Sequence, residues 1–78
     1  MRVTITTVGK RFYDGEAYAL IAPGSEGEMT ILSEHQPLVS RLKKGTLRVL
    51  KTKDAQPEEF PIEQGLLETA KEHVTVLL

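Results

Sequence analysis

The sequence predicts an all-β domain, with its strands arranged as an antiparallel sandwich or barrel. Two observations predict this: apolar and polar residues alternate with a period of two in several short segments, and turn-forming residues separate those segments. Successive side chains of a strand lie on opposite faces, so the alternation places one face of each segment in a core. The 78 residues are enough for one small domain, residues 1–78, with one modest core.

The first expected strand covers residues 1–9, where Val3 and Ile5 alternate with Arg2 and threonines. β-branched residues of this kind fit a pleated, half-buried strand. Asp14-Gly15 is expected to interrupt the chain, because this pair is frequent in turns. A second main strand is then expected over residues 16–22.

Pro23-Gly24 predicts a type II turn after that strand. Proline presets φ at the first central position of such a turn, and glycine accepts the positive φ at the second. A strand is expected over residues 28–32, followed by a loop over 33–37. Residues 38–42 are compatible with a strand or with a single helical turn.

Two strands are expected further along the chain, over residues 46–51 and 59–62. Leu47 and Val49 should point inward from the first of them. Pro61 lies in the second and has no backbone N–H to donate. The sequence therefore places residues 59–62 at an edge of a sheet.

Residues 62–74 fit two structures equally well. Good helix formers fill much of this segment, but Gly65 interrupts it and no side chain caps its start. The apolar residues with helical spacing are Ile62, Leu66, Leu67, Ala70 and Val74. Residues 73–78 return to the alternation of a strand.

The charge of the chain argues against a nucleic-acid partner. Ten basic and eleven acidic residues give a net charge of −1, whereas nucleic-acid binders carry a basic excess. Lys43, Lys44 and nearby Arg41 form a small basic cluster, as expected for a solvated turn. No apolar run is long enough for a membrane-spanning helix, so we expect no insertion into a bilayer.

The sequence contains no recognisable catalytic or metal-binding set. His35 and His73 lie on different segments, whereas a metal or catalytic site needs three or four convergent groups. There is no cysteine, no glycine-rich phosphate loop and no nucleophile elbow. We therefore expect neither an enzyme nor a cofactor or a metal.

Glu26 and Glu28 are two residues apart and, on a strand, would share one face. Such a pair suits a basic partner, but two exposed acids beside a turn explain it as well. The alternative to an interaction module is a small barrel that binds a ligand or an oligonucleotide. Single-strand binders stack bases on aromatic rings within a basic groove, and the few aromatic residues here, such as Tyr13 and Phe60, are not set among Lys or Arg.

The order of several short motifs is similar to that of the ε subunits of F-type ATP synthases, which are called δ in mitochondria. The motifs are FYDGE at 12–16, APGSEGEMTIL at 22–32, HQPL at 35–38, LKKGTLRV at 42–49, FPI at 60–62, GLLE at 65–68 and HVTVL at 73–77. The resemblance covers nearly the whole chain.

The resemblance implies a two-sheet antiparallel β-sandwich of about ten short strands. It makes residues 66–69 a strand and 70–72 a turn. It also implies a non-catalytic rotor subunit that couples the γ subunit to the membrane c-ring during proton- or sodium-driven ATP synthesis. Such a subunit is peripheral, on the cytoplasmic face of a bacterial membrane or the equivalent face of an organelle membrane.

The resemblance assigns two sets of contact residues. Glu26, Gly27 and Glu28 are expected to contact the c-ring, where a carboxylate accepts charge-assisted hydrogen bonds. The γ subunit is expected to contact His35, Pro37, Leu38 and Ser40. For Leu38, a place in the core is the alternative.

Most members of this family continue into two carboxy-terminal helices, which in bacteria can inhibit ATP hydrolysis and in some members bind ATP. This sequence contains neither helix. The resemblance therefore predicts either a naturally short form without the inhibitory helices or a piece cut from a longer chain, and in both cases no nucleotide binding by these residues.

Overall fold

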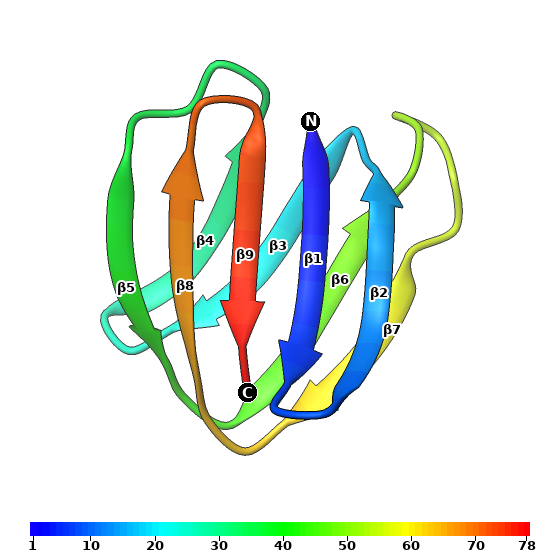
Figure 1. Cartoon of the computed structure of the whole chain (residues 1–78). Coiled ribbons are helices and arrows are strands. Elements are labelled where there is room, and N and C mark those ends of the chain that lie inside the picture. The colour runs from blue at the N-terminus through cyan, green and yellow to red at the C-terminus, as the bar shows by residue number, and fades with distance from the viewer.

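The computed structural model describes residues 1–78 and contains nine β-strands and no helix (Figure 1). In chain order the strands are β1 (Arg2–Thr7), β2 (Lys10–Glu16), β3 (Ala19–Gly24), β4 (Gly27–Leu32), β5 (Leu38–Leu42), β6 (Gly45–Leu50), β7 (Glu58–Ile62), β8 (Gly65–Ala70) and β9 (His73–Leu77). The prediction of an all-β domain is confirmed.

The strands form one continuous sheet in the order β2-β1-β9-β8-β5-β3-β6-β7, and β4, which lies off this path, pairs with β3 along the whole length of β3. In Figure 1 the first five strands of this order lie in front of the others, so the sheet curls into two layers. The layers are joined where β5 pairs with β3, through the single residue pair Gly24 and Leu42. The result resembles a sandwich, but its two layers belong to one continuous hydrogen-bonded sheet.

Nine strands agree with the expected number of about ten, but two parts of the predicted architecture are wrong. The strands form one curled sheet rather than two separate sheets, and this sheet is mixed rather than fully antiparallel. β1 and β9 run parallel, with Val3 opposite Val74 and Ile5 opposite Val76. A parallel pair needs a long connection between its two strands. Here the whole chain between β1 and β9 serves as that connection.

The core lies between the two layers and consists of aliphatic side chains from both. The large side chains that are fully buried are Val3, Ile5, Leu20, Leu47, Val49, Leu67, Val74 and Val76. Tyr13 and Phe60 close one side of this core with an edge-to-face contact, their ring centroids 6.1 Å apart. These two rings therefore pack against the core and each other, which leaves them poorly suited to stacking nucleic-acid bases.

The break predicted at Asp14-Gly15 is wrong, since both residues lie within β2. The Asp14 carboxylate accepts hydrogen bonds from Arg2 Nε at 2.9 Å and from Thr4 Oγ1 at 3.2 Å, both on β1. These cross-strand bonds replace the local bonds with which aspartate forms turns. The chain leaves the strand only after Glu16, and β3 begins at Ala19.

The turn predicted at Pro23-Gly24 is also displaced. Pro23 and Gly24 belong to β3 and pair with Glu28 and Gly27 of β4, so Ser25 and Glu26 form the turn. The positive φ, 135°, is found at Gly27 instead of Gly24.

Residues 62–74 contain two strands and no helix. β8 places Leu67 inward and pairs with β5 on one side and β9 on the other, so non-local pairing overrides the helical spacing. The turn between β8 and β9 contains Lys71 and Glu72, as the resemblance implied. Pro61 lies on β7, the last strand of the sheet order, which confirms its predicted place at an edge.

Candidate functional site

The hairpin between β3 and β4, which we call the acidic hairpin (residues 24–28), is tightly constrained. A Cβ atom on Gly24 would lie 2.7 Å from the carbonyl oxygen of Gly27, so only glycine fits there. Gly27 has a φ of 135°, a region that side chains disfavour. Two further backbone bonds of 2.9 Å, from Ser25 N to Arg41 O and from Lys43 N to Pro23 O, fix the hairpin to the end of β5.

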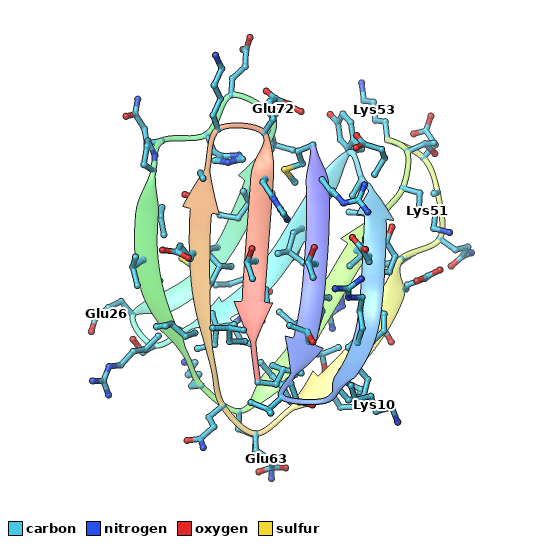
Figure 2. All side chains as sticks on the ribbon, viewed as in Figure 1. Lys10, Glu26, Lys51, Lys53, Glu63 and Glu72 are labelled. Carbon is cyan, nitrogen blue, oxygen red and sulfur yellow. The ribbon has the colours of Figure 1, made fainter.

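The two acids of this hairpin point outward. Figure 2 shows Glu26 projecting from the hairpin away from the domain. The Glu28 side chain is 68% exposed, and its Oε2 lies 4.0 Å from Nη1 of Arg48 on β6. Arg48 also donates from Nε to Glu59 Oε2 at 3.0 Å. Glu28 is thus displayed rather than buried, and its distant contact with Arg48 leaves it free to accept other donors.

The loop between β4 and β5 (residues 33–37) carries part of the predicted γ-contact set and is held by a buried threonine. The Thr69 hydroxyl donates to the carbonyl oxygen of Gln36 and accepts from the N–H of Leu38, both at 2.8 Å. It therefore fixes the backbone on both sides of Pro37. Sequence reasoning missed Thr69, although its inward position beside Leu67 on β8 marked it as a polar residue in the core.

His35 lies within the same loop, and both of its ring nitrogens contact backbone carbonyl oxygens of the domain. Nδ1 is 2.8 Å from the carbonyl oxygen of Leu32, and Nε2 is 2.6 Å from that of Ala70. The ring therefore connects the end of β4 to the end of β8. A partner that contacts His35 would meet the side of its ring rather than free nitrogens.

β5 exposes apolar side chains next to this loop. Leu38 is 36% exposed and lies outside the core cluster, which contradicts its alternative assignment to the core. Val39, which the sequence did not single out, is 64% exposed. Ser40 is half-buried and donates to the carbonyl oxygen of Arg41 at 3.2 Å.

The structure connects the two predicted contact sets in two ways: β4 runs between the acidic hairpin and the loop with His35 and Pro37, and Ser40 lies on β5 beside Arg41, which accepts a hydrogen bond from Ser25 of the hairpin. β4 begins at the acidic hairpin and ends at the loop that contains His35 and Pro37 (Figure 1). Because β4 is short and fully paired with β3, the acidic hairpin and the loop over residues 33–37 are held at a fixed separation.

A charged network lies on the outer face of β1 and β2. Asp14 pairs with Arg2 at 2.9 Å and with Arg11 at 3.1 Å. The hydrogen bond from Arg2 lowers the pKa of Asp14 below its ordinary value, assisted by the charges of both arginines and by Thr4. The same bond raises the pKa of Arg2. This network involves none of the predicted contact residues.

Other kinds of site find little support in the structure. No group of three or more His, Cys, Asp or Glu side chains is placed to hold a metal ion. A shallow surface pocket lies at the ends of β5, β8 and β9, lined by residues 41–42, 64–66 and 77–78, away from both histidines. The structure contains no helix that could cross a membrane.

Comparison with known proteins identifies relatives along the entire chain. Residues 1–78 match the family described as the β-sandwich domain of the ATP synthase delta/epsilon chain. The ATP synthase epsilon chain of Psychrobacter sp. (strain PRwf-1) is 39% identical over 77 residues, which are 99% of this chain and 55% of that protein. That of Janthinobacterium sp. (strain Marseille) is 36% identical over the same shares. The chain thus spans about half the length of the curated relatives it matches.

Solved structures share the fold. A chain of the Euglena gracilis mitochondrial ATP synthase matches with a TM-score of 0.85 and 23% identity, covering 96% of this chain and 48% of that one. A chain from the central stalk and c-ring of the Tetrahymena thermophila mitochondrial enzyme matches with a TM-score of 0.80 and 18% identity, covering 99% and 61%. The fold and the full-length family match lead to one conclusion: this chain belongs to the ATP synthase delta/epsilon family and contains its β-sandwich domain.

Proposed function

We propose that this chain is a non-catalytic rotor subunit in the central stalk of an ATP synthase, where it couples the γ subunit to the c-ring during ion-driven ATP synthesis. The match to the delta/epsilon family over residues 1–78 carries this proposal. The choice of partners is supported by the solved relatives, since one belongs to a central stalk and c-ring and the other to an OSCP/F1/c-ring assembly. In this role the domain is a peripheral part of a membrane complex, on the face that carries the stalk.

The geometry of β4 suits a coupling element. We propose that Glu26, Gly27 and Glu28 contact the c-ring, and that the γ subunit contacts His35, Pro37, Leu38 and Ser40. Torque passed between these sets would run along β4, which is hydrogen-bonded to β3 along its length. The backbone bonds of Ser25 and Lys43 resist bending of the acidic hairpin under load.

The proposal is tested by reversing the charge of Glu28. We expect Glu28→Lys to weaken assembly with the γ subunit and c-ring, because a cation replaces the proposed acceptor. The melting temperature should hardly change, since substitutions at exposed sites are usually within about 0.5 kcal/mol. The measurement is co-purification of γ and c subunits from membranes, with thermal unfolding of the isolated chain.

Glu59→Lys is the matched control, because Glu59 is also an exposed acid that contacts Arg48. It should leave assembly intact. If Glu28→Lys assembles as well as wild type does, the proposed contact of Glu28 with the c-ring is refuted. If, in addition, its melting temperature is lowered, Glu28 is a structural residue.

A further inference from the structure

β4 has a free edge along its whole length, since β3 is the one strand that pairs with it. Pro23 lies opposite Glu28, and the Pro23 carbonyl accepts from Lys43 on the side of β3 away from β4. In an antiparallel pair, residues whose backbone groups face each other alternate with residues whose groups point away from each other. The N–H and C=O of Glu28 therefore point away from β3, and so do those of Thr30. None of the backbone bonds outside the strand ladders involves Glu28 or Thr30.

The two outermost strands of the sheet order carry features that oppose pairing with a further strand. β2 has an irregular register with β1, at Ile5 and Thr6, and begins with Lys10 and Arg11. β7 contains Pro61. Bulges, prolines and basic side chains are the devices that usually protect an edge. β4 has a regular register and contains neither proline nor a basic residue, so its edge lacks this protection.

The domain is also open on the side of β4, where inward side chains remain accessible. β5 pairs with β3 at Leu42 alone and does not pair with β4, and Figure 1 shows β4 and β5 diverging from the hairpin. Leu38 shares the inward face of β5 with Leu42, yet Leu38 is 36% exposed and Leu42 is 4% exposed. Met29, on the inward face of β4, is half-buried. Apolar side chains in this position gain free energy when another element covers them.

We propose that an extended segment of the γ subunit adds to the free edge of β4 as a further strand. Its backbone pairs with Glu28 and Thr30, and its inward apolar side chains cover Met29 and Leu38. In strand addition of this kind, main-chain hydrogen bonds supply affinity and the contacts of alternate side chains supply specificity. The choice of γ rests on the proposed function, in which Leu38 and the loop beside it contact that subunit.

Acidic residues at both ends of this edge determine which strand fits. Glu26 lies in the hairpin before β4 and Glu34 in the loop after it, and both are exposed. A segment with basic residues near its ends complements these charges. A second copy of this chain fits badly, because antiparallel pairing of two β4 strands about Thr30 sets Glu26 of one copy opposite Glu34 of the other. Like charges directly opposite each other are destabilising.

Backbone pairing at this edge is compatible with the proposed c-ring contact. Successive side chains of a strand alternate between faces, so Glu28 lies on the outer face of β4 and Met29 on the inner face. The Glu28 carboxylate is 68% exposed. The added strand uses the backbone of Glu28 and leaves this carboxylate on the surface.

Amide hydrogen exchange of the 78-residue chain tests the strand addition directly. In the free chain, the amides of Glu28 and Thr30 should exchange fast, whereas those of Met29 and Ile31, which face β3, should exchange slowly. With isolated γ subunit in excess, the amides of Glu28 and Thr30 should become slow as well. Binding of γ without this protection would overturn the strand addition while the stalk contact stands. No binding of γ would overturn both. Protection that appears without γ and is lost on dilution would assign the edge to a second copy instead.

Thr30→Pro removes the edge N–H and keeps the ladder with β3, since proline is tolerated on an edge strand where its missing N–H faces outward. We expect this variant to bind γ about ten-fold more weakly than wild type. Thr30→Ala is the matched control, because it removes the side chain but keeps the N–H, and it should bind γ as wild type does. Equal binding by Thr30→Pro and wild type would refute the pairing. If Thr30→Pro does not fold, the exchange experiment on wild type decides the question.

Discussion

A Cβ atom placed on Gly45 would lie 2.8 Å from the Cβ of Pro23 on the neighbouring strand. The start of β6 thus lies against the side chain of Pro23, the residue that precedes the acidic hairpin. The carbonyl oxygen of Pro23 also accepts the hydrogen bond from Lys43 that fixes this hairpin. Pro23 therefore takes part both in the close packing on Gly45 and in the hydrogen bond that holds the hairpin, so a shift of Pro23 would disturb both.

Replacing Gly45 by alanine should destabilise the domain. The added methyl group has no room against Pro23, and overpacking of this kind costs about 1–3 kcal/mol. Urea unfolding at neutral pH measures the loss. Gly15→Ala is the control, because the nearest atom to its Cβ, Tyr13 Oη, is at an ordinary 3.7 Å. Similar losses for the two variants would show that the contact with Pro23 is not the cause.

Thr69 should be essential for the loop that holds Pro37, because its hydroxyl pairs with two backbone groups at once. Thr69→Val keeps the shape but leaves the Leu38 N–H and the Gln36 carbonyl without partners. An unsatisfied buried polar group costs about 1–3 kcal/mol, so the free energy of unfolding should fall by that amount.

The matched control for this change is Thr75→Val, on the outer face of β9, where valine suits a strand as well as threonine does. We expect it to alter the free energy of unfolding by less than about 0.5 kcal/mol. Amide hydrogen exchange of Leu38 should become faster in Thr69→Val only. An unchanged exchange rate there would contradict the bracing role of Thr69.

The inward faces of most strands were predictable from the sequence, because burial on one face imposes a period of two. Leu47 and Val49 on β6, and Val74 and Val76 on β9, are buried as the alternation required. The edge position of Pro61 followed from its missing N–H. A turn beside the acidic residues was predicted at Pro23-Gly24, but it lies two residues further along the chain. Pro23 and Gly24 pair with β4 and therefore belong to β3.

Features that depend on distant pairing could not be predicted. The parallel pair of β1 and β9 joins the two ends of the chain, and no local pattern reports it. The partners of the predicted site residues were hidden for the same reason. His35 bonds to Ala70 and Leu38 to Thr69, each more than 30 residues away. The choice between helix and strand over residues 62–74 was likewise decided by pairing with β5.

The network around Asp14 should make stability depend on acidity in a predictable direction. The hydrogen bond from Arg2, with the charges of Arg2 and Arg11, lowers the pKa of Asp14 in the folded domain. A lowered pKa means that folding favours the carboxylate. The stabilisation is therefore complete above the unfolded pKa of about 4 and is lost as the pH falls through the folded value.

We expect Asp14→Asn to be less stable than wild type at neutral pH, because the amide carries no charge for Arg2 and Arg11. The difference should narrow as the pH falls below about 4, where wild type loses the same charge by protonation. Urea unfolding across this range measures both arms. Asp54→Asn is the control, since Asp54 lies exposed in the loop before β7 and takes no part in the network of Arg2 and Arg11. A difference between Asp14→Asn and wild type that stays constant with pH would show that the carboxylate acts through its shape alone.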